Sequence, residues 1–66
     1  MGYIFRIEVD CFKFDENGYY WNLWCRKDEM EAPWQICATG STKTIEEAFN
    51  KAYDVQKRYE KIKPID

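Results

Sequence analysis

The 66-residue sequence predicts a single α+β domain, a three-stranded antiparallel sheet (β-β-β-α) with one C-terminal amphipathic helix packed on one face. Three observations predict this fold. The first stretch alternates apolar and polar residues with the period of a half-buried strand, and two shorter apolar stretches follow between turn residues. The last third repeats apolar residues at spacings of three and four, as an amphipathic helix does. Three Trp, five Tyr and four Phe supply enough apolar surface to fold.

The first predicted strand runs from Tyr3 to Cys11, where the odd positions are apolar and several even positions are charged. The stretch from Asp15 to Gly18 has turn chemistry, because Asn17 and Gly18 tolerate positive φ. A second strand from Tyr19 to about Arg26 completes a hairpin.

A three-residue loop from Glu16 to Gly18 predicts a register in which the numbers of paired residues sum to 34. This register places two oppositely charged pairs on one face and apolar pairs on the other. The pairs are Glu8 with Arg26, Arg6 with Asp28, Val9 with Cys25, and Cys11 with Leu23.

The polar stretch from Arg26 to Pro33 predicts a longer, solvent-facing connection. Trp34 to Thr39 is expected to form a short third strand, and Gly40 to Lys43 a turn.

A capping box predicts where the helix begins, because Glu47 follows Thr44 by three residues. The helix is expected to span about 18 residues and to end before Pro64. Its apolar stripe consists of Ile45, Ala48, Ala52, Val55, Tyr59 and Ile62, widened by Phe49 and Tyr53. The sheet face that it covers is expected to carry Tyr3, Phe5, Ile7, Val9, Cys11, Leu23, Cys25 and either Trp34 or Ile36.

Several residue types that catalysis or metal binding needs are missing. Histidine, the commonest general base and metal ligand, is absent. The cysteine spacings match no zinc pattern, and the three glycines are too scattered for a phosphate-binding loop. We therefore expect no enzyme, no metal, no cofactor and no small-molecule substrate.

Charge and cysteine content bear on location and partners. Ten Lys and Arg against twelve Asp and Glu give a net charge of −2, which disfavours nucleic acid as a partner. No apolar run is long enough to span a membrane. An odd number of cysteines suits reduced thiols, with Cys11 and Cys25 as small buried hydrophobic residues and Cys37 more exposed. These features predict a cytoplasmic protein, and its small core favours a homodimer or a bound partner.

Aromatic residues at even positions form the candidate binding site. In the predicted register Phe14 meets Tyr20, Phe12 meets Asn22, and Asp10 meets Trp24. Four aromatic side chains, those of Phe12, Phe14, Tyr20 and Trp24, then gather on the face away from the helix and mark a contact with another protein or a second copy. The alternative is a bulge around Cys11 that turns Phe12 and Phe14 into the core.

A basic cluster near the end of the helix is the alternative site, where a nucleic acid would bind. It consists of Lys57, Arg58, Lys61 and Lys63. The same charges also complement the helix macrodipole, which explains them without a ligand.

The order of several motifs resembles the N-terminal domain of HicB-type antitoxins. The matching parts are Asp15-Glu16-Asn17-Gly18-Tyr19, the strand that ends at Cys37, and Thr44-Ile45-Glu46-Glu47-Ala48 with Ala52. The resemblance implies a degenerate, non-catalytic RNase H-like sheet that dimerises and masks a small RNA-cleaving toxin. Small inhibitors of the phage type would bind a protein partner in the same manner.

Overall fold

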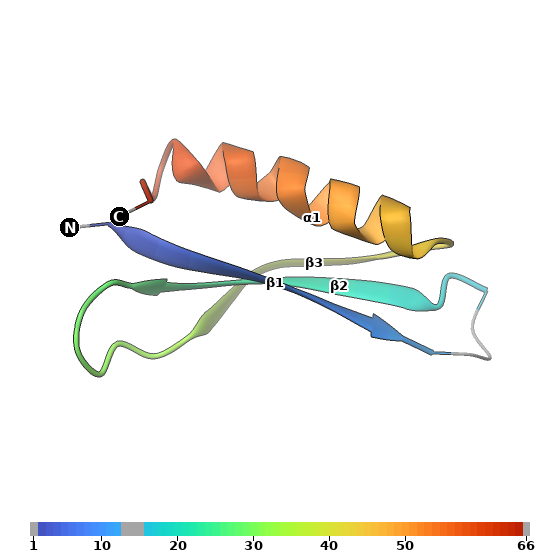
Figure 1. Ribbon diagram of the computed structural model, residues 1–66, viewed down its shortest axis with the longest axis horizontal. Helices are drawn as coiled ribbons and strands as arrows, with labels where there is room; N and C mark the ends of the chain where they lie inside the picture. Colours follow the sequence, from blue (N-terminus) through green and yellow to red (C-terminus); the bar gives the residue numbers. More distant parts are fainter. Residues whose placement is uncertain (1, 13–15, 66) are drawn as a thin grey trace.

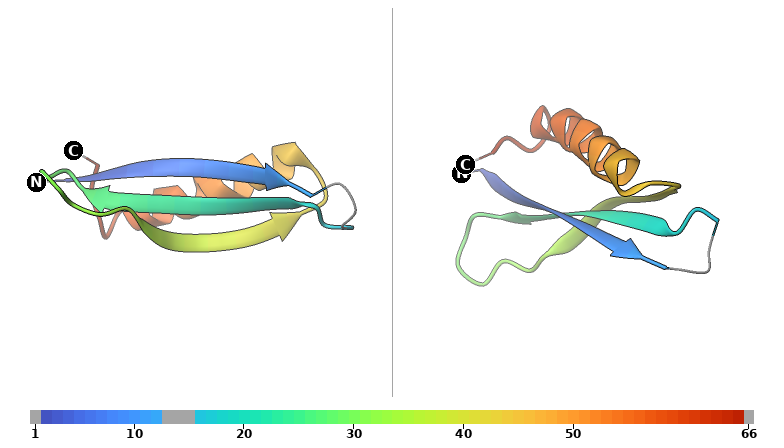
Figure 2. Two further views of the ribbon diagram at one scale, coloured as in Figure 1. Left: turned by 90° about the horizontal axis from the view of Figure 1, so that it is seen from below. Right: turned by 45° about the vertical axis from the view of Figure 1, so that its right-hand side comes forward.

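A computed structural model describes residues 2–12 and 16–65 (Figure 1). Its three strands are β1 (Tyr3–Cys11), β2 (Tyr19–Lys27) and β3 (Gln35–Thr42), and they form one antiparallel sheet in the order β1-β2-β3. The helix α1 (Ile45–Glu60) lies across one face of this sheet, and no described element covers the other face (Figure 2). The predicted three-stranded α+β fold is confirmed.

The core is a thin layer between the helix and the sheet. Leu23 of β2 is fully buried, and Ala48 and Ala52 of α1 are fully buried above it. Small side chains at these two positions let the helix approach the sheet closely, and burying one Leu side chain stabilises the fold by about 1.5–3 kcal/mol. Trp21 lies beside Leu23 and packs over Gly40 on β3.

The helix begins where the sequence predicts. Thr44 has extended backbone angles, and its hydroxyl accepts a hydrogen bond from the Glu47 backbone N–H at 3.2 Å. Glu46 and Glu47 stand in the first turn and Lys57 and Arg58 in the last, so both ends complement the macrodipole.

The helix ends at Glu60, earlier than predicted. The backbone N–H groups of Ile62 and Lys63 donate to the Tyr59 carbonyl at 2.9 and 2.6 Å, which closes a turn. The chain then runs beside the start of β1, where the Tyr3 N–H donates to the Pro64 carbonyl at 2.7 Å. Both described ends of the chain therefore meet at one end of the sheet (Figure 1).

The predicted register of the first hairpin is wrong by four residues. Ile7 pairs with Leu23 and Glu8 with Asn22, so that paired numbers sum to 30 instead of 34. The physical reason is a longer connection, because the Phe12 N–H already donates to the Gly18 carbonyl at 2.7 Å. A shift by an even number keeps every side chain on its predicted face. The expected charge pair of Glu8 with Arg26 does not form.

The third strand is longer than predicted and contains a bulge. It continues to Thr42, so the expected turn from Gly40 to Lys43 is wrong. The register shifts opposite Leu23 and Trp24, which brings both Cys37 and Ala38 against the core. Ile36 therefore lies on the uncovered face. Trp34, just before the strand, is exposed too, so the expectation that one of these two residues packs under the helix is wrong.

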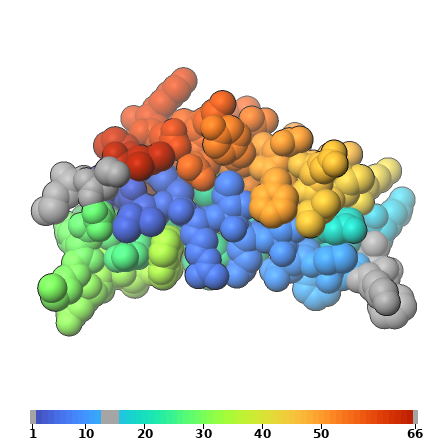
Figure 3. All heavy atoms as spheres, in the orientation of Figure 1, coloured from blue at the N-terminus to red at the C-terminus, as the bar shows by residue number. Residues whose placement is uncertain are grey.

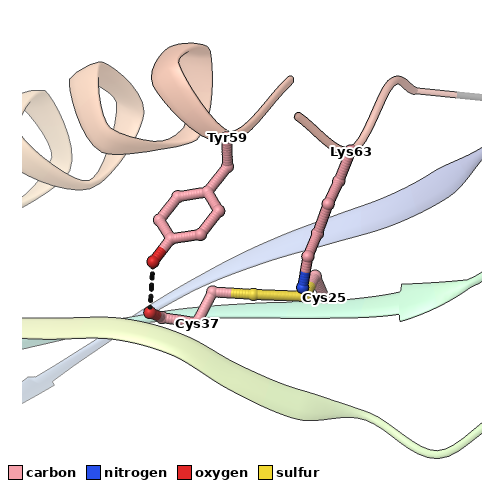
Figure 4. Close-up of a disulfide and its surroundings, with 4 residues drawn as sticks. All are labelled: Cys25, Cys37, Tyr59 and Lys63. Atoms are coloured by element: carbon pink, nitrogen blue, oxygen red, sulfur yellow. Dashed lines mark hydrogen bonds between the residues drawn. A yellow bond between two sulfur atoms is a disulfide. The ribbon is translucent and has the colours of Figure 1, made fainter. Parts of the chain in front are cut away.

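The cysteines differ from the expectation of reduced thiols. Cys25 and Cys37 form a disulfide between β2 and β3, with Cα atoms 6.3 Å apart (Figure 4). The Tyr59 hydroxyl donates to the Cys37 carbonyl at 2.9 Å, and the Lys63 ammonium lies 3.8 Å from the Cys25 sulfur. Cys11, the last residue of β1, is a free, exposed thiol and not the core residue that was expected.

Candidate functional site

The candidate site is the sheet face opposite the helix, which we call the outer face. Because strand side chains alternate, the even positions of β1 and β2 point to this face. Described residues on it are Ile4, Arg6, Glu8 and Asp10 of β1 with Phe12 directly after it, Tyr20, Asn22, Trp24 and Arg26 of β2, and Ile36, Thr39 and Ser41 of β3.

Two aromatic rings meet at the hairpin end of the outer face. Phe12 and Tyr20 have ring centroids 5.2 Å apart in an edge-to-face arrangement. Phe12 is 53% exposed, so the bulge that would have turned it into the core is absent. We call Phe12 and Tyr20 the hairpin-end pair. Phe14, the third predicted member, lies outside the described residues.

A second apolar group lies at the opposite end of the outer face. Trp24 of β2 stands beside Ile36 of β3, and its indole N–H donates to the Glu8 carboxylate at 3.4 Å. The Arg26 guanidinium lies over the Trp34 ring, 5.3 Å from its centroid. Ile36 is 53% exposed and Trp34 is exposed as well. We call Trp24, Arg26, Trp34 and Ile36 the open-end cluster.

Polar side chains separate the two apolar groups. Asn22 stands between Tyr20 and Trp24 on β2, and its amide donates to Asp10 at 3.4 Å. Beside Asn22, a shallow depression of about 380 Å³ is lined by Tyr20, Thr39 and their neighbours on β3. The three described members of the predicted cluster therefore fall into two groups, with Trp24 apart from Phe12 and Tyr20.

The predicted basic cluster is divided. Lys57, Arg58 and Lys61 are exposed at the end of the helix, and the Lys57 ammonium lies 4.7 Å from the centre of the Tyr53 ring. Lys63 turns toward the sheet, where it lies over Tyr3 and near the Cys25 sulfur (Figure 4). Only three of the four basic groups thus face solvent together.

Sequence reasoning missed the contribution of β3 and of the loop before it. Ile36 reaches the outer face only because of the bulge, and no local pattern predicts a bulge at Cys37. The contact of Arg26 with Trp34 brings together the two ends of the long connection between β2 and β3, and no local pattern predicts it. A pocket of about 390 Å³ lies under this connection, lined by residues that include Arg26, Glu29 and Lys63.

The other reactive groups include a free thiol, Cys11, and the phenol beside it. Among residues 2–12 and 16–65, no three acidic or cysteine side chains lie close enough together to hold a metal ion. Cys11 touches Tyr19, and its hydrogen bond and then its negative charge raise the pKa of that phenol above the ordinary 10.0. A tyrosine that stays protonated is a hydrogen-bond donor and acceptor rather than a base.

Comparison with known proteins adds no relative. The chain matches no family model, no curated protein and no solved structure. In the described part of the chain, the one helix is too short and too polar to cross a lipid bilayer. Evidence on function therefore comes from the outer face and from the surfaces next to it.

Proposed function

We propose that this protein is a small non-catalytic binding module that holds another protein on its outer face and also associates with itself. The observation that carries the proposal is the exposure of large apolar side chains on a sheet face that no described residue covers. Scattered single hydrophobic residues are ordinary on a protein surface, whereas paired ones at both ends of one face mark an interface.

The composition of the face supports a protein partner. Trp, Tyr, Phe and Arg are the residues enriched at protein interfaces, and the hairpin-end pair and open-end cluster together hold all four types. The polar residues between these two groups include Asn22 and Thr39, which supply hydrogen-bonding groups that orient a partner. A partner that fits would place apolar side chains on the two ends and polar groups on the centre.

Local charge selects among partners. On β1 the outer face holds Arg6, Glu8 and Asp10, and Arg6 already pairs with Glu8 at 3.7 Å. With Arg26 on β2, the outer face carries two basic and two acidic groups, so it has no excess of positive charge to attract a phosphate backbone. The resemblance to HicB-type antitoxins supports one specific version, in which the partner is a small RNA-cleaving toxin.

The proposal is tested by removing one apolar side chain from each end of the face. Phe12→Ala with Ile36→Ala changes two half-exposed residues, so the fold should persist. Ile62→Ala is the matched control, because Ile62 is exposed and apolar but lies outside the outer face. Proteins that bind the tagged full chain are identified by mass spectrometry, purified, and titrated by calorimetry.

The double variant should bind the purified partner at least about tenfold more weakly, because a few large apolar side chains carry most of the binding energy of an interface. The control should stay within about twofold of wild type. Equal affinity of the double variant and wild type, in a variant that keeps its circular dichroism spectrum, would contradict the proposal.

The alternative function is nucleic-acid binding through Lys57, Arg58 and Lys61, which are exposed together at the end of α1. Titration of a labelled nucleic-acid duplex at several salt concentrations distinguishes nucleic-acid binding from protein binding. Phosphate contacts give an affinity that falls steeply with salt, and an apolar interface does not.

A further inference from the structure

The helix exposes a second apolar surface, away from the outer face. Ile45, Phe49 and Tyr53 are 49%, 47% and 50% exposed. They are four residues apart, so they lie along one side of the helix. The lysine at position 57 continues the same line, with its ammonium over the Tyr53 ring. We call Ile45, Phe49, Tyr53 and Lys57 the helix flank.

The helix flank lies on the side of β1. Ala48 and Ala52 face the sheet, and each is followed by a flank residue about 100° further around the helix. Because the helix is right-handed and runs antiparallel to β1, this step leads from the sheet toward β1 (Figure 1). Figure 3 shows the helix atoms standing directly above those of β1, and Figure 2 shows the first half of α1 reaching past this edge.

The strand below the flank has an open edge. β1 pairs only with β2 among the named strands, and the terminal segment at Pro64 and Ile65 covers only its first residue, Tyr3. Since the Tyr3 N–H points away from β2, the backbone groups of Phe5, Ile7 and Val9 point the same way. A long edge of this kind is ready to pair with another strand.

The β3 edge of the sheet has neither a regular open strand nor an apolar helix side above it. β3 carries the bulge, which twists an edge and interrupts pairing. The side of α1 toward β3 carries charged residues in place of apolar ones, among them Lys51 and Arg58. An apolar helix flank above an open strand edge therefore occurs on the β1 side alone within the described structure.

The charges around the helix flank of one copy are complementary to those around the helix flank of a second, antiparallel copy. Reading along the chain, Lys43 and Glu46 stand near the first turn, and Lys57 and Glu60 stand near the last. When two copies of α1 lie antiparallel with paired numbers summing to 103, Glu46 meets Lys57 and Lys43 meets Glu60 of the other copy. Phe49 and Tyr53 of the other copy sum to 102, one residue from this pairing, so their rings lie beside each other near the centre.

We infer that two copies of this chain associate across the β1 edge, with their helix flanks packed antiparallel around a twofold axis normal to the sheet. The axis makes the two β1 strands antiparallel as well, so both open edges are covered and one six-stranded sheet results. Both outer faces then lie on the same side of the dimer. The inference takes up the self-association in the proposed function, but it uses residues that the outer face does not.

Charge reversal tests the inference. Glu46→Lys sets like charges opposite each other twice per dimer, and Lys57→Glu does the same. The double variant E46K/K57E restores opposite charges only between copies, since the two positions are about 16 Å apart along one helix. Lys51→Glu is the matched control, on the side of α1 toward β3. Sedimentation equilibrium over micromolar to several hundred micromolar protein measures association, and circular dichroism checks each fold.

Wild type and K51E should form the same dimer. Either single reversal should weaken it about tenfold, and the double variant should recover most of the loss. A monomeric wild type, a dimer insensitive to E46K, or a double variant as weak as the singles would each overturn the inference. The charge-reversal variants should lose the dimer and still bind the outer-face partner with unchanged affinity. Phe12→Ala with Ile36→Ala should do the opposite, weakening partner binding and leaving the dimer intact.

Discussion

Substituting Gly40 by alanine tests the packing of β3 against the core. Gly40 pairs with Trp21, and a methyl group added there would stand 2.6 Å from two atoms of the indole ring. That separation is well inside van der Waals contact. Trp21 is only 7% exposed and packs against the helix, so the ring has no free space into which to move.

Two opposing effects set the magnitude. Overpacking a core position typically costs about 1–3 kcal/mol. Gly40 has no positive φ, so alanine also lowers the entropy of the unfolded chain, which stabilises the folded state by about 0.4–1 kcal/mol. We expect the G40A variant to lose about 1–2 kcal/mol of unfolding free energy, which lowers Tm by roughly 5–15 °C in a domain of this size.

Urea denaturation followed by tryptophan fluorescence measures this loss, with Ser41→Ala as the control at the exposed neighbouring position. Combining Gly40→Ala with Trp21→Phe should recover part of the loss, because a smaller ring leaves room for the methyl group. A G40A variant as stable as wild type, or more stable, would refute the close contact between Trp21 and β3.

Thr44→Ala should lose about 1 kcal/mol of stability in the same urea assay, because it removes the acceptor at the start of the helix. Reducing the bond between Cys25 and Cys37 should cost about 2–3 kcal/mol, since a cross-link over 12 residues restricts the unfolded chain; an equal urea midpoint with and without dithiothreitol would contradict this. Cys11→Ala should lower the pKa of Tyr19 toward 10.0, observed by NMR of the labelled ring. Because the folded pKa is raised, the stabilisation of wild type is present below pH 10 and is lost as pH rises through the folded value.

Local interactions made part of this structure predictable. The cap of the helix depends on Thr44 and Glu47 alone, so the sequence pattern located it correctly. The alternation in the first strand assigned Phe5 and Ile7 to the helix side and Phe12 to the outer face, and the structure agrees. These assignments survived the error in register because the error was an even number of residues.

Features that depend on contacts between distant segments were not predictable in the same way. Asn17 and Gly18 indicated a tight turn, but the last hydrogen bond between the two strands joins Phe12 and Gly18, which makes the connection longer. Only the pairing of the whole sheet decides between the short and the long connection. The bulge in β3 follows no local pattern, and the disulfide depends on it, because the bulge brings Cys37 to the inner face. For the candidate site, the outward positions of Phe12, Tyr20 and Trp24 were predictable, whereas the contributions of Trp34 and Ile36 were not.

The orientation of the outer face is the central claim, and NMR with a paramagnetic cosolute tests it most directly. Signals from side chains that solvent reaches lose intensity, and buried ones do not. The structure predicts strong and similar loss for Phe12 and Ile36, with Leu23 unaffected as an internal reference. Protection of Phe12 and Ile36 to the level of Leu23 would contradict the claim.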